Sequence, residues 1–483
     1  MRNVLFATSE AHPLIKTGGL ADVSGSLPQA LNKLNCDVRV LLPYYQEIKN
    51  KLDNVKQIAQ FSVSGHAGTI SLLETLLPGS EVKVWLIDYP KAFDRPGNPY
   101  LDEQGLPWPD NAERYTLFSK AAALIATGQI VTDWKPDIVH CNDWQTGLIP
   151  ALLAQQPQKP ATLFTIHNLA YQGMFSRETY LSLDLPDYLW SPDTMEFHNQ
   201  ISFIKGGLVF ANIITTVSPG YAREIQTAEF GYGLEGLLKH RADRLSGILN
   251  GIDMDIWNPA KDPLIEQNFS AKTLKEKQKN KSALQKEFSL PVESNTPLIG
   301  MVGRLVQQKG IDIVLEALPD LLQESIQLVI LGTGEKEYEK AIKQFAKQYP
   351  KQISALIGYD ETLAHRIEAG ADMFLMPSRF EPCGLNQLYS LRYGTVPVVQ
   401  GVGGLLDSIV DTNTKTQKNK TATGYIFTEA SPDALLKTLK RAIETYKKPQ
   451  IWRSIARTGM QQNFSWEESA KKYIQLYEKA AAL

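Results

Sequence analysis

Short apolar runs that are continuous rather than alternating constrain the fold of this chain more than any other feature. Residues 4–8 and 298–302 are two such runs, and helical patterns separate them from the next runs along the chain. Continuous apolar runs are typical of strands buried on both faces, as in a parallel sheet covered by helices. The pattern therefore predicts an α/β fold with doubly wound sheets.

The apolar runs fall into two series. In the first, residues 4–8 and 38–42 flank a helical segment at 22–34, and later runs end at Cys141, Ile166 and Val217. The second series follows a polar, lysine-rich interval and comprises residues 298–302, 327–331, 353–357, 372–376 and 396–399. Because 483 residues are too many for one ordinary core, we expect two domains. They are residues 1–250 and 251–464, joined through a turn-rich stretch at 250–259.

The end of the chain is predicted to be helical. Ser465 begins a capping box, and an apolar stripe at helical spacing follows it, made of Ala470, Tyr473, Ile474, Tyr477 and Ala481. We expect this helix, residues 465–483, to pack back on the N-terminal domain. Two polar segments are predicted at the surface, the lysines of residues 272–286 on the exposed side of a helix and residues 411–423 as a loop.

Composition excludes several classes of protein. Lys plus Arg number 50 against 52 for Asp plus Glu, so the chain offers no broad basic footprint for nucleic acid or an anionic membrane. The short N-terminal apolar run leads directly into a glycine loop and does not resemble a signal peptide, which predicts a cytoplasmic protein. Three cysteines without metal-ligand spacing predict free thiols in a reducing compartment. The sequence does not indicate the oligomeric state.

Polar and glycine residues follow the predicted strands, where ligands bind in open parallel sheets. The first of these is the turn that contains Lys16, Gly18 and Gly19, just ahead of a helix. Two glycines allow the backbone N–H groups to approach a ligand, and a helix N-terminus favours an anion. The alternative interpretation is a tight turn with an exposed lysine.

The second half carries further candidates for an anion site. Arg304 and Lys309 follow a strand, and two cations there could hold a diphosphate and stabilise its charge as a sugar bond breaks. Glu381 could accept hydrogen bonds from sugar hydroxyls or stabilise an oxocarbenium-like centre, and Gly384 would open the next helix. The alternatives are surface charge beside a glycine turn and a carboxylate that complements a helix dipole.

Two single residues and one acidic pair complete the candidate set. His167 and Asp143 each follow a strand, although a structural histidine and a helix cap are the ordinary roles of such residues. Asp253 and Asp255 form the Asp-x-Asp pattern of metal-dependent transferases, but two carboxylates alone make a poor Mg²⁺ site. Because Arg304 and Lys309 could replace a cation, we expect no metal.

Taken together and in order, these motifs resemble those of bacterial glycogen synthases and plant starch synthases, retaining glucosyltransferases of the GT-B fold. The resemblance covers essentially the whole chain. It is carried by residues 16–23 (KTGGLADV), 94–100 (DRPGNPY), 140–147 (HCNDWQTG), 165–173 (TIHNLAYQG), 217–221 (VSPGY), 250–253 (NGID), 303–304 (GR), 308–310 (QKG) and 381–384 (EPCG).

The resemblance implies two Rossmann-like domains facing across a cleft. It also implies transfer of glucose from ADP-glucose to an α-1,4-glucan or maltooligosaccharide, with release of ADP and without a cofactor. It would make Glu381, His167, Arg304 and Lys309 catalytic. The donor-binding residues would be Lys16, Gly18, Gly19, Asn250, Tyr359, Gly384 and Leu385, and the acceptor would face Asp143 and Tyr100. Retention would then follow from front-face attack, with the leaving phosphate helping to take the acceptor proton.

Three departures bear on the donor preference. Asn386, Val402 and Ser408 stand where relatives often have threonine. The alternatives are a UDP-glucose transferase, a glucan phosphorylase and a non-catalytic glucan-binding homologue. A phosphorylase would need a longer chain and a pyridoxal phosphate lysine. A non-catalytic homologue would have lost charged site residues that are intact here.

Overall fold

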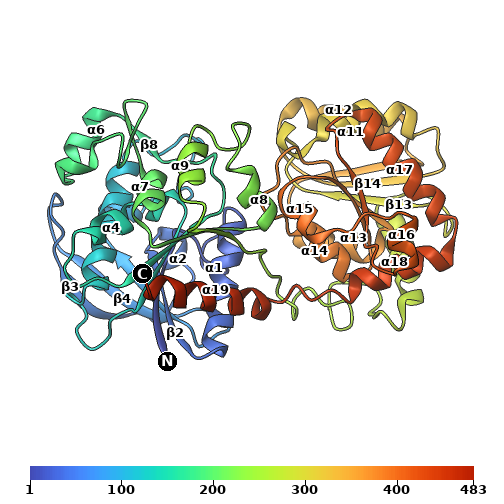
Figure 1. Ribbon diagram of the computed structural model, residues 1–483. Helices are drawn as coiled ribbons and strands as arrows, with labels where there is room; N and C mark the ends of the chain where they lie inside the picture. The colour runs from blue at the N-terminus through green and yellow to red at the C-terminus, as the bar shows by residue number, and fades with distance from the viewer. The chain divides into compact units, whose positions relative to one another are not determined.

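The computed structural model describes residues 1–483 and divides the chain into two compact units (Figure 1). Unit 1 comprises Met1–Gly251 and Trp466–Leu483, and unit 2 comprises Ile252–Ser465. The chain therefore passes between the units twice, and both termini belong to unit 1. None of the helices has the length and apolar character that a membrane span requires.

Unit 1 is built on a nine-stranded sheet in the order β12-β11-β7-β6-β1-β2-β5-β4-β3. The strands from β12 to β5 pair in parallel, whereas β4 and β3 extend one edge in antiparallel fashion. The strands are β1 (Arg2–Ala7), β2 (Cys36–Pro43), β3 (Lys56–Phe61), β4 (Ile70–Leu76), β5 (Lys83–Asp88), β6 (Ile138–Asn142), β7 (Ala161–Ile166), β11 (Ile213–Thr216) and β12 (Leu245–Gly247).

A small antiparallel sheet and ten helices complete unit 1. The sheet has the order β8-β10-β9, from β8 (Met174–Phe175), β9 (Glu196–Phe197) and β10 (Gln200–Ser202). The helices are α1 (Gly19–Lys33), α2 (Gln46–Lys49), α3 (Pro90–Phe93), α4 (Asn111–Ala126), α5 (Leu148–Ala154), α6 (Arg177–Ser182), α7 (Phe203–Phe210), α8 (Pro219–Glu224), α9 (Glu235–His240) and α19 (Trp466–Ala481).

Unit 2 contains a six-stranded parallel sheet in the order β15-β14-β13-β16-β17-β18, with helices above and below it in Figure 1. Numbered within the unit this is 3-2-1-4-5-6, the Rossmann order. The strands are β13 (Leu298–Val302), β14 (Gln327–Gly332), β15 (Ile353–Ile357), β16 (Met373–Met376), β17 (Val396–Gln400) and β18 (Tyr425–Phe427). The helices are α10 (Lys277–Glu287), α11 (Ile311–Leu321), α12 (Lys336–Gln348), α13 (Glu361–Gly370), α14 (Asn386–Arg392), α15 (Gly403–Ser408), α16 (Thr414–Lys418), α17 (Pro432–Tyr446) and α18 (Pro449–Met460).

The continuous apolar runs correspond to strands buried on both faces. Along β13, Ile299 and Met301 join one hydrophobic cluster, with residues of α11 and α17, while Leu298 joins a second cluster, with residues of α10 and α13. Successive side chains of a strand point to opposite faces, so a strand covered on both sides needs an apolar residue at every position. The predicted doubly wound α/β fold is confirmed.

The strand order reverses once in each parallel sheet. In unit 1 the reversal lies between β1 and β6, and in unit 2 between β13 and β16. Connections leave the sheet in opposite directions at such a point, which opens a crevice at the carboxyl ends of the two strands. Each unit therefore has one preferred place for a ligand.

The last helix belongs to unit 1, where α19 packs on α1 and β7 (Figure 1). Buried His140 of β6 joins it to the sheet, because Nδ1 lies 2.8 Å from the Tyr477 hydroxyl and Nε2 lies 2.7 Å from Thr165 Oγ1. Burial holds the pKa of His140 well below its usual value, so the ring is neutral. The predicted apolar stripe is buried at Ala470, Tyr473 and Tyr477, whereas Ala481 is exposed.

Two surface predictions are corrected by the structure. Lys277 and Lys281 of α10 are buried rather than exposed, because α10 packs closely on α13. Residues 411–423 are not a plain loop, since they contain α16, which Asn413 and Thr416 begin with a capping box. The polar side chains of that segment serve the helix start, which apolar periodicity does not reveal.

Candidate functional site

In unit 1 the glycine turn ahead of α1 surrounds a carboxylate. Glu10, which follows β1, accepts hydrogen bonds from the N–H groups of Thr17 (2.5 Å) and Gly18 (3.1 Å) and from the Thr17 hydroxyl (2.6 Å). Lys16 Nζ lies 2.7 Å from Asp22 Oδ1, and its side chain is 42% exposed. Of the two glycine N–H groups predicted to meet a phosphate, that of Gly18 is therefore held by Glu10 in this structure.

Tyr100 reaches the same carboxylate from a distant part of the chain. Its hydroxyl lies 2.5 Å from Glu10 Oε1 and 2.8 Å from Ser9 Oγ. Burial, followed by the charge of Glu10, raises the pKa of Tyr100 well above its usual value. Tyr100 therefore stays protonated and is a hydrogen-bond donor at the carboxyl end of β1.

His167 and Asp143 are held together beyond β6 and β7. Asp143 Oδ1 accepts the His167 N–H at 2.7 Å, and Asn142 Oδ1 lies 3.0 Å from His167 Nε2. Because the Asn142 amide nitrogen donates to the Ala7 carbonyl, its oxygen faces the ring, and Nε2 carries the proton. Burial lowers the pKa of His167 to about 3, so the imidazole is neutral and can only polarise or orient a ligand.

Asp143 has a strained backbone conformation and a raised side-chain pKa. It has φ +56°, in the left-handed region that residues other than glycine seldom adopt. Burial raises its pKa to about 7 against the opposing effect of the His167 and Asn168 N–H groups. Strain and a displaced pKa at one residue are features of functional sites.

Replacing Asp143 by asparagine is expected to stabilise the protein at pH 8 and to change it little at pH 4, near the unfolded pKa of about 3.9. A pKa raised to about 7 means that the folded chain binds the proton more tightly, so the stability contributed by Asp143 is present below the unfolded pKa and lost as pH rises through about 7. Asparagine keeps the acceptor oxygen without the charge. Thermal unfolding should shift upward by roughly 2–4 °C for each kcal/mol gained.

The exposed carboxyl of Asp193 supplies the matched control for that measurement. Asp193→Asn should leave the melting temperature unchanged at both pH values. Equal stabilisation by Asp143→Asn at pH 4 and pH 8 would refute the proposed cost of a buried charge.

Asn250, near the end of unit 1, carries an orphaned polar atom. The residue is 7% exposed, and its Oδ1 has no hydrogen-bond partner. Most buried polar atoms in native proteins are hydrogen-bonded, so an acceptor without a donor calls for a further group. A hydroxyl of a ligand would supply that donor.

In unit 2 the central contact is an ion pair between Lys309 and Glu381. Lys309 Nζ lies 2.5 Å from Glu381 Oε2, and the Ser378 hydroxyl donates to the same oxygen at 3.0 Å. Lys309 follows β13 and Glu381 follows β16, so the pair joins the two strands at the reversal of strand order. Gly310 allows this approach with φ +72°, where a Cβ atom would lie 2.0 Å from the Pro377 carbonyl oxygen.

Hydrogen bonds through Gln308 connect Arg304 to the loop that precedes Glu381, at the same edge of the sheet. The Arg304 guanidinium donates to Gln308 Oε1 at 3.0 Å, and the Gln308 amide donates to the Phe380 carbonyl at 2.8 Å. Arg379 has a different role, because it forms a two-pronged ion pair with Asp312 at 2.6 and 2.7 Å. The edge therefore presents Arg304 and Lys309 beside Glu381, while Arg379 anchors α11.

Two further donor candidates of unit 2, Gly384 and Leu385, lie at the start of α14. Gly384 has φ +73°, and Leu385 is the N-cap of the helix. The Asn386 amide donates to the Val302 carbonyl at 2.8 Å, so the residue that replaces threonine binds the end of β13. Tyr359 follows β15, is 79% exposed, and its hydroxyl lies 3.4 Å from Glu361 Oε2.

Both carboxylates of the Asp-x-Asp pattern are engaged in local contacts. Asp253 Oδ1 accepts the N–H groups of Asp255 (2.8 Å) and Ile256 (3.0 Å), and Asp255 lies 2.6 Å from Lys261 Nζ. No group of three or more His, Cys, Asp and Glu side chains is arranged to hold a metal ion. Asp253 stabilises a turn.

Two residues of these clusters were missed by the sequence analysis. Glu10 and Ser378 each lie just beyond a strand, β1 and β16, as the other candidates do. The carboxyl-end rule could have found both. The distances that tie them to Tyr100 and Glu381 are tertiary contacts that no local pattern reports.

Two Rossmann-like units, each with polar residues at its reversal of strand order, define a glycosyltransferase of the GT-B fold. The family model for the starch synthase catalytic domain matches residues 3–240, and that for glycosyl transferases group 1 matches residues 283–459. The chain belongs to the glycogen and starch synthase family of glycosyltransferases.

Relatives match over nearly the whole length. Glycogen synthase 2 of Nitrosococcus oceani is 55% identical over 99% of this chain and 97% of its own. Glycogen synthase of Cellvibrio japonicus is 52% identical over 99% of both chains. The catalytic domain of starch synthase IV from Arabidopsis thaliana, solved with ADP and acarbose bound, has a TM-score of 0.88 at 33% identity and covers 100% of this chain and 99% of that one.

Proposed function

We propose that this glucosyltransferase elongates an α-1,4-glucan with glucose from ADP-glucose, retaining the α configuration and releasing ADP. The observation that carries the proposal is the Lys309–Glu381 pair beside Arg304, at the ligand edge of a Rossmann-like sheet. Two cations match the charge of a diphosphate, and the carboxylate matches a centre that becomes positive. The ADP and acarbose bound to starch synthase IV support the adenine nucleotide and the glucan.

In unit 2, Arg304 and Lys309 would neutralise the diphosphate as it leaves. The backbone at Gly384 and Leu385 would contribute N–H groups to the same phosphates, and Tyr359 would stack on the nucleobase. Glu381 would bind glucose hydroxyls close to the anomeric carbon. The contacts of Arg304, Lys309 and Glu381 would strengthen as negative charge moves to the phosphate and positive charge to the sugar.

In unit 1, neutral His167 would pack on the glucose ring or accept a hydroxyl hydrogen bond at Nδ1, and Asn250 Oδ1 would accept a hydroxyl proton. Asp143 and Tyr100 would face the acceptor. Lys16, Gly18 and Gly19 would bind donor phosphate once the carboxylate of Glu10 turns away from the Gly18 N–H. Glu10 would then be free to accept a hydrogen bond from a glucan hydroxyl.

Retention is proposed to proceed by attack on the face from which ADP leaves. Glu381 is ion-paired with Lys309, which suits it to charge stabilisation rather than to attack on carbon. The acceptor hydroxyl oxygen would bond to the anomeric carbon as the carbon–phosphate oxygen bond breaks. Its proton would pass to the leaving phosphate oxygen, so no separate base is required.

The test is incubation of the purified chain with maltooligosaccharide and either ADP-glucose or UDP-glucose. Release of nucleoside diphosphate, sizing of the products and their cleavage by an α-1,4-specific glucosidase report the reaction. ADP-glucose should give the higher kcat/KM. A preference for UDP-glucose would overturn the proposed donor, and no elongation with either donor would favour a non-catalytic glucan-binding homologue.

Turnover is expected to continue at its full rate in excess chelator. Arg304 and Lys309 are proposed to take the place of a divalent cation, and Asp253 and Asp255 are engaged in local contacts. The measurement is ADP release with and without chelator, followed by addition of Mg²⁺ or Mn²⁺. A loss of activity that either cation restores would contradict the proposal.

A further inference from the structure

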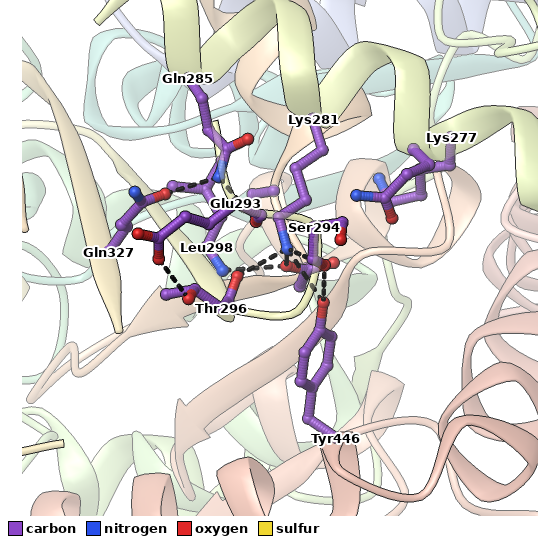
Figure 2. A network of polar contacts seen from close by, with 12 residues as sticks. Lys277, Lys281, Gln285, Glu293, Ser294, Thr296, Leu298, Gln327 and Tyr446 are labelled. Atoms are coloured by element: carbon purple, nitrogen blue, oxygen red, sulfur yellow. Dashed lines mark hydrogen bonds and ion pairs between the residues drawn. The ribbon is translucent and has the colours of Figure 1, made fainter. Parts of the chain in front are cut away.

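The lysine-rich helix α10 turns two ammonium groups into the protein. Lys277 is 9% exposed and Lys281 is 1% exposed, and Figure 2 shows both leaving the same helix. Side chains four residues apart share one face of a helix, so both lie on the side that meets the rest of unit 2. Burial of an ammonium group is costly unless acceptors surround it.

Lys281 is fully compensated by its neighbours. Its Nζ lies 2.7 Å from Asp372 Oδ2. It also donates to the carbonyls of Ser294 (3.0 Å) and Thr296 (2.6 Å) and to the Tyr446 hydroxyl (2.9 Å), as Figure 2 shows. Asp372 also accepts the Leu298 N–H at 2.9 Å. The charge of this carboxylate is therefore used on Lys281.

Lys277 has hydrogen bonds but no carboxylate in contact. Its Nζ donates to the carbonyls of Glu368 (3.0 Å) and Ala369 (2.7 Å) and to Thr395 Oγ1 (2.7 Å). Burial lowers the pKa of Lys277 to about 7 and raises that of the Glu368 carboxyl to about 8. Asp372 and Glu368 act on Lys277 through space, but neither carboxylate contacts its Nζ.

A pocket of ≈ 650 Å³ opens beside these two lysines. Its wall includes three more cations, Lys275, Lys447 and Arg453, and the aromatic ring of Trp452, whereas Asp372 is its one carboxylate. The volume falls within the range of small-molecule sites. The pocket therefore combines an excess of positive charge with an apolar surface.

The pocket lies at the opposite end of the sheet from the candidate donor residues. Ser294 and Asp372, which line it, come just before β13 and β16, whereas Arg304 and Glu381 follow those strands. Parallel strands align their amino ends along one edge. This site is therefore separate from the glucosyl-transfer residues of unit 2.

We propose that this pocket binds a phosphate monoester of a sugar or a nucleoside. The phosphate dianion would accept hydrogen bonds from Lys275 and Arg453 and would act on Lys277, whose three N–H groups are already engaged, through charge alone. The organic part would pack on Trp452. Lysine and arginine together provide point charge and bidentate donors for such a group.

The experiment titrates the full-length chain with inorganic phosphate, glucose 1-phosphate and AMP by calorimetry, with glucose as the uncharged reference. Saturable one-to-one binding of inorganic phosphate and tighter binding of one ester are expected, and the better ester distinguishes a sugar from a nucleoside. The double variant Lys275→Ala/Arg453→Ala should raise the ester Kd by about tenfold or more. The single exposed variant Lys275→Gln repeats the test if the double variant does not fold by circular dichroism.

The matched control removes two lysines from the exposed side of α10. Lys279→Ala/Lys286→Ala makes the same change of charge outside the pocket and should keep the Kd within about twofold, less than the 1.4 kcal/mol of a tenfold change. Lys309→Ala tests whether the ester binds at the donor edge instead. The proposal is overturned if no phosphate binds saturably, if both double variants weaken binding equally, or if Lys309→Ala abolishes it.

Discussion

Replacing Lys309 by alanine is expected to lower kcat at saturating donor by about 10²–10³-fold, the usual cost of one charge-stabilising contact, roughly 2.7–4 kcal/mol. The ammonium group lies 2.5 Å from Glu381 in the free protein and would meet the departing diphosphate during transfer. Its contribution grows as the phosphate gains charge, so the loss should appear in kcat more than in the donor KM. ADP release at saturating ADP-glucose is the measurement.

Two further variants make this result specific. Lys340→Ala removes an exposed lysine of α12 and should leave kcat unchanged. Lys309→Arg keeps a cation and should recover part of the lost rate. A Lys309→Ala enzyme with near-normal kcat would reduce Lys309 to a structural partner of Glu381.

Glu381→Gln is expected to lower kcat by a similar factor, about 10²–10³-fold, because it removes charge at nearly constant shape. The Ser378 hydroxyl can still donate to the new amide oxygen, so the loop after β16 should keep its conformation. What the variant loses is the attraction between the Glu381 carboxylate and the sugar as positive charge develops on the sugar. The readout is kcat, with circular dichroism and thermal unfolding as checks on the fold.

The exposed Glu337→Gln is the matched control, and it should behave as the parent does. Lys309 and Glu381 touch, so their effects should not add. The double variant Lys309→Ala/Glu381→Gln should be slower than the parent enzyme by less than the product of the two single-variant factors. Full activity of Glu381→Gln would exclude the carboxylate from charge stabilisation.

The architecture could be predicted from the sequence wherever strands are buried on both faces. Residues 298–302 coincide with β13, and residues 396–399 with all but the last residue of β17, because strands buried on both faces need apolar side chains along their length. The antiparallel edge strands were not predicted. β3 (Lys56–Phe61) is partly exposed along its length and contains lysine and glutamine, so its apolar pattern is weak.

The candidate site was predictable as a set of residues but not as a set of contacts. Lys309, His167 and Glu381 could be named because each follows a predicted strand and parallel strands bring their carboxyl ends to one edge. Glu10 was missed, and its partner Tyr100 lies 90 residues away in the chain. A contact of that separation depends on the path of the whole chain.

What the sequence by itself determined was the class of fold, the order of the strands along the chain and the identity of the residues at their ends. The tertiary structure alone decided which charges are buried and what they meet. Lys277 and Lys279 are the same residue type on one helix, yet the first donates to Glu368 and Ala369 at the end of α13 while the second lies exposed. Helical periodicity sets the angle between two side chains, but only packing against α13 determines which of them faces the protein.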